Sequence, residues 1–319
     1  MKALRWIALS LAVLLLLTSA GCRNQQPAKQ KLVIASPIGL AKLLPTILVK
    51  KRLIQERYKG EIEVEQRAIP FGTVINEGVV AGEIDVAVLS STHAMLGVIK
   101  GVPYRICSAY SNHAYSLCVL DERFQGLEDF APGDRIALPS LGGNTHLKLC
   151  RLVEQRLGSP SALNPMLIEM SAADAVQALM TGGVSATFLP FPHNYVQQAQ
   201  PGVRVLYESV GEEPITELVA VATLDLHDKY PALYDAVVQA VHDAIDYIRD
   251  NPDEVASMLA EEYKLDPAVM RECLGALSFH TVPVGLEDML DMMLELELLG
   301  DAPEKLPELC FEGVTEAKP

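Results

Sequence analysis

The chain has 319 residues, half of them hydrophobic, and its 41 acidic against 26 basic residues give a formal net charge of −15. This acidity argues against nucleic acid as a partner, because such binding needs lysine and arginine to neutralise phosphates, and against adsorption on an anionic membrane surface. The length suits one large domain or two medium-sized lobes.

The N-terminal residues have the pattern of a lipoprotein signal. Two basic residues among the first five precede an apolar stretch, residues 7–17, and small residues then lead directly to Cys22. This apolar core is shorter than the roughly 20 residues that a membrane-spanning helix needs, which favours a secretory signal. We expect residues 1–21 to be the signal peptide, Cys22 to carry the lipid anchor outside the cytoplasmic membrane, and residues 22–31 to form a polar tether. The alternative is a plain secreted protein.

From residue 31 to residue 110, short apolar strands alternate with helical stretches. Strands are expected at 31–36, 61–69, 85–90 and 104–110, and helices at 40–58, 73–80 and 91–100. This alternation predicts a parallel sheet covered by helices on both faces.

A second unit of the same kind follows, and the chain then becomes helical. Strands are expected at 116–120, 135–140, 163–170, 186–190 and 203–209, and helices at 144–157, 173–180 and 194–200. A long β segment at 215–226 precedes a helix with an apolar stripe from Leu233 to Ile248, another helix after Pro252 and a last one at 286–299.

Two α/β units joined by extended segments near 110–117 and 211–219 indicate two lobes with two crossings. The segment 215–226 is expected to rejoin the first lobe. We predict a first lobe of residues 32–112 and 215–319 and a second lobe of residues 113–214. Open α/β sheets bind ligands at the carboxyl ends of their strands, so the cleft between the lobes is the expected binding place.

Four segments of the chain follow one another in a recognisable order: GEIDVAVLSS (82–91), LEDFAPGDRIALPSLGGNTHLKL (127–149), IDYIRDNPDEVASMLAEEYKLD (245–266) and GLEDMLDMMLELELLG (285–300). In these segments the chain resembles a known family, the periplasmic solute-binding proteins of the nitrate/sulfonate/taurine class. The resemblance implies a two-lobed periplasmic-binding-protein type II fold with doubly wound sheets and a helical C-terminal region. It also implies a monomer that closes by a hinge on a small polar or anionic solute and delivers it to an ABC permease and its ATPase.

The stretch FLPFPHNYV (188–196) departs from the family pattern, so the identity of the solute does not carry over. A protein that binds a pyrimidine or thiamine precursor, and a ligand sensor without transport, remain alternatives on the same fold. Cytoplasmic enzymes with this fold are a further alternative, against which the signal and Cys22 argue. The sequence has no H-E-x-x-H, G-x-S-x-G, P-loop or G-x-G-x-x-G motif after a strand, so we expect a protein that is not an enzyme and has no cofactor.

Candidate ligand-binding residues lie where strands end and helices begin, because helix N-termini present unpaired N–H groups that suit an oxyanion. They are Ser36, Ser90, Ser91, Thr92, Ser140, Asn144, Thr145 and His146, with Phe191 as a possible cleft wall. Helix capping is the competing interpretation for Ser91, Thr92 and Asn144, a structural role competes for His146, and core packing competes for Phe191.

Six cysteines are present, without the spacing of a zinc site, and no metal is expected. Cys107 and Cys118 lie on neighbouring predicted strands, where they either form a disulfide or act as small buried hydrophobic residues.

Overall fold

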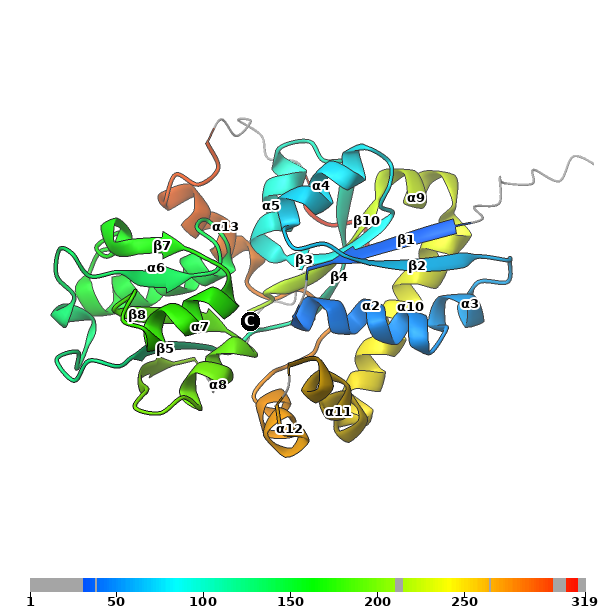
Figure 1. Cartoon of the computed structure of the whole chain (residues 1–319). Coiled ribbons are helices and arrows are strands. Elements are labelled where there is room, and N and C mark those ends of the chain that lie inside the picture. The colour runs from blue at the N-terminus through cyan, green and yellow to red at the C-terminus, as the bar shows by residue number, and fades with distance from the viewer. Residues whose placement is uncertain (1–30, 38, 210–214, 264, 301–307, 315–319) are drawn as a thin grey trace, which may run out of the picture.

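The computed structural model describes residues 31–37, 39–209, 215–263, 265–300 and 308–314, which form two α/β lobes (Figure 1). The expected signal peptide, Cys22 and nearly all of the expected tether lie outside the described residues. Within these ranges, no helix is both long enough and apolar enough to cross a membrane.

The first lobe is built on a five-stranded sheet with the strand order β2-β1-β3-β10-β4. Its strands are β1 (Lys31–Ser36), β2 (Glu63–Ala68), β3 (Val86–Ser90), β4 (Tyr104–Ser111) and β10 (Leu218–Thr223). β1 is parallel to β2 and β3, whereas β10 is antiparallel to β3 and β4. The four strands predicted within residues 31–110 therefore run parallel to one another, and the return strand β10 lies antiparallel between β3 and β4. The chain returns from the second lobe at the carboxyl ends of the parallel strands, so β10 enters the sheet running the opposite way.

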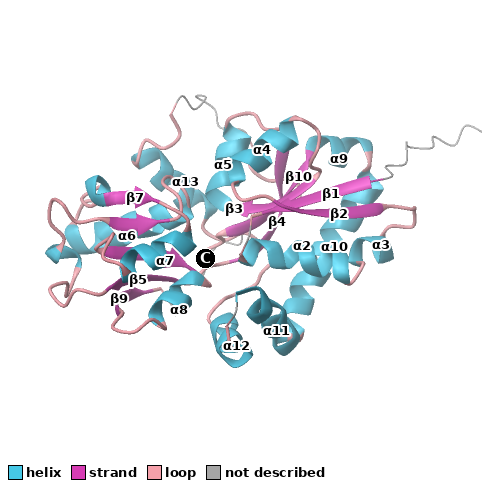
Figure 2. Ribbon diagram, in the orientation of Figure 1, coloured by secondary structure: helices cyan, strands magenta, loops and turns pink. Residues whose placement is uncertain are grey.

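Helices cover both faces of this sheet, as Figure 2 shows. One face packs against α2 (Leu40–Lys50), α3 (Leu53–Arg57) and α10 (Pro231–Asp250), and the other packs against α4 (Gly72–Val80) and α5 (Ser91–Ile99). The predicted apolar stripe of α10, from Leu233 to Ile248, is buried in the first of these layers. The helix expected at 40–58 is instead two helices, because Arg52 takes a left-handed conformation (φ 55°) that an α-helix cannot contain.

The second lobe is built on a sheet with the order β7-β6-β8-β5-β9. Its strands are β5 (Tyr115–Val119), β6 (Ile136–Leu138), β7 (Leu167–Glu169), β8 (Ala186–Pro190) and β9 (Arg204–Glu208). β6 is parallel to β7 and β8, and β5 is antiparallel to β8 and β9. One face is covered by α6 (Asn144–Leu157), and the other by α7 (Ala172–Met180) and α8 (His193–Gln198).

Two details of the strands differ from the sequence expectation. The β segment predicted to run to residue 226 ends at Thr223, whose hydroxyl accepts a hydrogen bond from the Leu226 N–H and caps α9 (Leu224–Lys229). Cys107 and Cys118 are both buried and free, and they belong to β4 and β5 in different sheets, so the disulfide alternative is wrong.

Three further helices complete the chain: α11 (Pro252–Tyr263), α12 (Pro267–Gly275) and α13 (Leu286–Glu295). α11 and α12 extend the first lobe below α10, whereas α13 lies against both α5 of the first lobe and α6 of the second (Figure 1). Leu286 and Met293 of α13 share an apolar cluster with Leu147 of α6. The lobes are therefore joined by packing as well as by the crossing segments.

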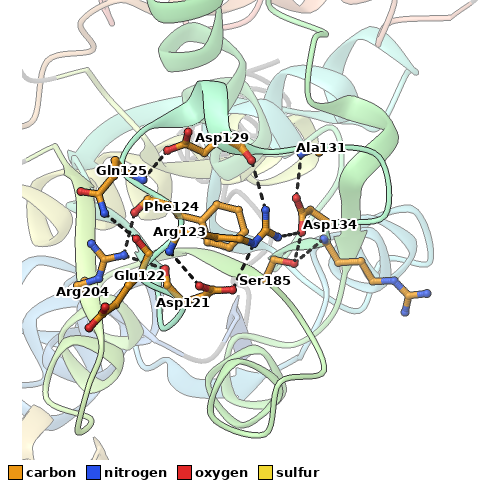
Figure 3. A network of polar contacts seen from close by, with 11 residues as sticks. Asp121, Glu122, Arg123, Phe124, Gln125, Asp129, Ala131, Asp134, Ser185 and Arg204 are labelled. Carbon is orange, nitrogen blue, oxygen red and sulfur yellow. Dashed lines mark hydrogen bonds and ion pairs between the residues drawn. The ribbon is translucent and has the colours of Figure 1, made fainter.

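The long connection between β5 and β6 is held by a polar network (Figure 3). Arg123 donates to the carboxylates of Asp121 and Asp134 and lies over the ring of Phe124, with its guanidinium carbon 3.9 Å from the ring centroid. From β9, Arg204 donates to the carbonyls of Asp121 and Phe124, both at 2.8 Å. These contacts tie the connection to its own sheet.

Candidate functional site

The N-termini of α5 and α6 meet where the two lobes touch. The Asn144 Oδ1 accepts a hydrogen bond from the Thr92 N–H at 3.1 Å, and its Nδ2 donates to the Glu217 carbonyl at 2.5 Å. The Ser91 hydroxyl donates to the Thr216 carbonyl at 2.5 Å. Ser91, Thr92 and Asn144 are all buried. The structure thus brings three of the predicted residues together and uses their polar groups in contacts within the protein.

Ser90 and Ser140 lie beside this contact, one on each lobe. Ser90 caps α5: its hydroxyl accepts from the His93 N–H at 3.4 Å and lies 2.7 Å from the His93 Nδ1. A Cβ added to Gly143 would lie 2.9 Å from the Ser140 Oγ and 3.5 Å from the His93 Cε1. Ser140 and the His93 ring therefore approach each other around a glycine that has no side chain to separate them.

His146 has both ring nitrogens engaged. Its Nδ1 accepts from the Gly142 N–H at 3.0 Å, which places the proton on Nε2, and Nε2 lies 3.3 Å from the Asn164 Oδ1. Burial lowers the pKa of His146 and also that of His93, so both rings are favoured in the neutral form.

Thr145 faces a buried acid–phenol pair. It lies at the Tyr115 hydroxyl, which donates to the Glu217 carboxylate, and burial together with that carboxylate raises the pKa of Tyr115 well above its ordinary value. His113 approaches the same carboxylate from the first crossing, with Nδ1 3.9 Å from the Glu217 Oε2. Tyr115 therefore stays a hydrogen-bond donor, and Thr145 belongs to the polar core of the lobe contact.

Ser36 and Phe191 are buried, and their side chains take no part in the hydrogen bonds described above. Ser36 is fully buried at the end of β1, and its hydroxyl has no hydrogen-bond partner among the described residues. Phe191 is buried in the apolar cluster of the first lobe that contains Leu40 and Tyr110, and it makes an edge contact with Tyr195 at 6.2 Å between ring centroids. A side chain of the second lobe is thus part of the core of the first.

A pocket of about 650 Å³ opens next to this contact, between the two lobes. The first lobe contributes Thr73, Asn76, His93, Leu96, Gly97, Lys100 and Val102. The second lobe contributes Leu141, Gly142, His146, Asn164 and Leu167, and Leu298, after α13, completes the wall. Of the predicted residues, His146 lines the pocket. Ser140 and Thr145 directly precede the lining residues Leu141 and His146 in the chain.

Sequence reasoning missed Asn76, Lys100, Asn164 and Leu298 as pocket residues. Asn76 lies inside α4, Lys100 ends α5, and Asn164 begins a short 3₁₀ helix (Asn164–Met166). None follows a strand directly, so the rule that placed ligands at strand ends did not select them. Within the described ranges, no group of three or more His, Cys, Asp or Glu side chains is suited to hold a metal ion.

Comparison with known proteins gives a family and a fold. The family model described as NMT1/THI5 like matches residues 62–255. The periplasmic aliphatic sulphonate binding protein of Escherichia coli has 20% identity and a TM-score of 0.70, with 86% of this chain and 95% of that chain covered. The alkanesulfonate-binding protein of Xanthomonas axonopodis pv. citri bound to MOPS has 18% identity and a TM-score of 0.72, with 86% and 96% covered.

A Candida albicans protein with the generic periplasmic binding protein fold has 14% identity and a TM-score of 0.63, with 89% of this chain and 99% of that chain covered. None of the curated proteins compared with the chain matches it. The predicted two-lobed periplasmic-binding-protein fold is confirmed, and so is the resemblance to the nitrate/sulfonate/taurine class.

Proposed function

Because the chain belongs to the NMT1/THI5-like family, we propose that it is the extracytoplasmic solute-binding component of an ABC importer. It binds a small polar or anionic solute between its lobes and passes it to the permease and its ATPase. It acts as a binding protein and not as an enzyme. The lipid on Cys22 holds it at the membrane as a monomer, with residues 32–112 and 215–319 as one lobe and 113–214 as the other.

The observation that carries this proposal is the pocket of about 650 Å³ whose wall comes from both lobes. A ligand in this pocket contacts α5 on one side and the start of α6 on the other. Such a ligand binds the closed arrangement more tightly than an open one, so it shifts the population toward closure. A permease that recognises the closed arrangement then receives loaded protein in preference to empty protein.

Thermal unfolding with a solute panel tests the proposal. The panel contains sulfonates, nitrate, bicarbonate, carboxylates and pyrimidines, the last to cover a pyrimidine-binding relative. At a concentration of 100 times Kd, a true ligand adds about 2.7 kcal/mol to the free energy of unfolding and raises Tm by roughly 5 °C. If no compound raises Tm, the protein does not bind a solute of these classes.

Two tryptophan substitutions locate the binding place. Leu141 is 46% exposed and lines the pocket, so Leu141→Trp fills part of it without disturbing the core. Val205 is 43% exposed on β9, outside the pocket, and Val205→Trp is the matched control. The expected result is a smaller ligand-induced rise of Tm in Leu141→Trp and an unchanged rise in Val205→Trp. An equal rise in both would place the solute elsewhere.

A further inference from the structure

The first polar group in the pocket wall is the side-chain amide of Asn76. Its Oδ1 accepts a hydrogen bond at 2.9 Å from the Tyr104 hydroxyl, which also lies 3.3 Å from the His93 carbonyl. A Cβ added to Gly97 would lie 3.1 Å from the Asn76 Nδ2, so this NH₂ group lies beside Gly97, itself part of the wall. The NH₂ group has no partner among the described residues, and Asn76 therefore presents a donor to the pocket.

The second is the amide of Asn164, on the opposite lobe. Its Oδ1 accepts from the His146 Nε2 at 3.3 Å and lies 3.8 Å from the Cys150 Sγ. Because the Gly142 N–H fixes which nitrogen of His146 carries the proton, the orientation of the Asn164 amide follows from the backbone. Its oxygen is occupied, so Asn164 too presents its NH₂ group.

The charge of the wall contrasts with the charge of the whole protein. The chain carries a formal net charge of −15, yet none of the pocket-lining residues is Asp or Glu, and Lys100 adds a cation. The Glu169 carboxylate lies behind the wall, where it accepts from the Leu141 N–H at 2.8 Å. A hydrogen-bond donor needs an acceptor, and an anionic acceptor gains most from donors and a nearby ammonium group. The lining therefore favours a ligand group that accepts hydrogen bonds and carries negative charge.

Thr73, His93 and His146 add further polar side chains, the rest of the wall is apolar, and the pocket is large. Leu96, Leu141, Leu167 and Leu298 supply hydrocarbon surface around a space of about 650 Å³. Pockets of roughly 300–1,000 Å³ with mostly apolar walls and a few placed polar groups are typical of sites for organic ligands. An inorganic ion such as nitrate fills little of this space and leaves the leucine side chains without contacts.

We propose that the solute is an organic acid with an apolar body at least the size of a six-membered ring, and that Asn76, Asn164 and Lys100 select its acceptor groups. This inference rests on the proposed solute-binding function and narrows it. It separates such acids from inorganic oxyanions, which lack the apolar body, and from amines and zwitterions such as taurine. The ammonium group of those molecules would meet donors and a lysine in the wall.

Calorimetric titration with simple probes tests the ligand class. Benzoate and benzenesulfonate combine an anionic group with an apolar ring. Acetate and nitrate have the anionic group without the ring, and benzylamine has the ring with an ammonium group, which donates hydrogen bonds. We expect at least one of the first pair to bind tenfold or more tightly than the other probes. Tighter binding of benzylamine, acetate or nitrate would overturn the inference and leave the solute-binding function standing. If no probe and no member of the wider panel binds, both are overturned.

Two conservative substitutions test the residues. Asn76→Asp and Asn164→Asp each replace the NH₂ group by an oxygen, add a negative charge, and keep the oxygen that Tyr104 or His146 needs. Each is expected to weaken binding of the better aromatic acid at least tenfold. Lys100→Met is expected to weaken it only a few-fold, and more at low salt, because the lysine is exposed and screened.

Asn251→Asp is the matched control, because the Asn251 amide donates to the Tyr247 carbonyl at 2.9 Å at the end of α10, away from the pocket. The affinity of this control variant for the better aromatic acid is expected to equal that of the unsubstituted protein. The thermal midpoint of each variant shows whether it is folded. Unchanged affinity in both folded pocket variants would overturn the assignment of these amides.

Discussion

The side chain of Asn144, the first residue of α6, accepts a hydrogen bond from the backbone N–H of Thr92 in the first turn of α5, at 3.1 Å. The same amide donates to the carbonyl of Glu217 on the return segment. One buried side chain of the second lobe thus satisfies backbone groups of the first lobe on two different segments. These hydrogen bonds join the two lobes, and a separation of the lobes would break them.

Replacing Asn144 tests the strength of this contact. Asn144→Ala removes the acceptor of the Thr92 N–H, whereas the Glu217 carbonyl keeps the Ser91 N–H at 3.0 Å, and a buried polar group left unpaired costs about 1–3 kcal/mol. We expect this loss in the free energy of urea unfolding, together with a larger radius of gyration in small-angle scattering as the lobes open. Asn251→Ala, at the end of α10, is the control. Equal losses in both variants would mean that Asn144 has no special role in the lobe contact.

Ser91 tests a contact within one lobe, because Ser91 and Thr216 both belong to the first lobe. The Ser91 hydroxyl donates to the Thr216 carbonyl at 2.5 Å, and Ser91→Ala removes one hydrogen bond worth about 1 kcal/mol. We expect this loss in the free energy of urea unfolding, without the larger radius of gyration expected for Asn144→Ala. Ser257→Ala, on the exposed side of α11, should change neither quantity. A radius of Ser91→Ala as large as that of Asn144→Ala would contradict this prediction.

Stability should fall in mildly acidic solution. Burial lowers the pKa of six histidines: His93, His113, His146, His193, His242 and His280. A buried neutral histidine contributes stability above its unfolded pKa of about 6.5, and this contribution is lost as the pH falls below that value, because the unfolded chain then binds the extra proton.

His280 is a suitable single case, because desolvation is the cause of its lowered pKa and its Nε2 lies 2.8 Å from the Thr216 Oγ1. His280→Gln cannot titrate, so the stability difference between the unsubstituted protein and this variant should shrink between pH 7.5 and pH 5. Urea unfolding at several pH values measures it. A difference that grows as the pH falls would mean that the folded protein holds His280 in the charged form.

Cys22 is predicted to be the lipidated N-terminal residue of the exported protein. Mass spectrometry of the N-terminal peptide from detergent-extracted membranes should show acylation at Cys22, and Cys22→Ala should prevent it. Cys22 lies outside the described residues, whose first strand begins at Lys31, and we expect the variant to keep the thermal midpoint of the unsubstituted protein. An unmodified N-terminus at another position would contradict the prediction.

The fold could be predicted largely because hydrophobic periodicity is local information. The alternation of strands and helices, and the buried stripe from Leu233 to Ile248, were recognisable from spacing alone. The predicted ends of strands and helices were wrong where a single residue ends one element and starts the next. Leu224 and Leu226 continue the apolar run after β10, but the Thr223 side chain starts a helix there, and Arg52 divides a helix that its neighbours favour.

The site could be predicted only in part. Ser91, Thr92 and Asn144 follow strands, and the general rule for strand ends placed them at the lobe contact, where the structure finds them. Asn76 and Asn164 line the pocket only because α4 and the second lobe lie on opposite sides of it, and no local sequence pattern encodes this arrangement. Phe191 has an aromatic side chain suited to a cleft wall, yet it is enclosed by the core of the other lobe.

The position of β10 affects the order in which the molecule can be assembled. Its neighbours β3 and β4 are complete by residue 111, but β10, which lies between them, begins only at Leu218. All five strands of the second sheet, ending with β9 at Glu208, precede it in the chain. During synthesis from the N-terminus, the lobe encoded in the middle of the gene therefore finishes its sheet first. The lobe that was begun first keeps an open gap with two unpaired strand edges until Leu218–Thr223 closes it.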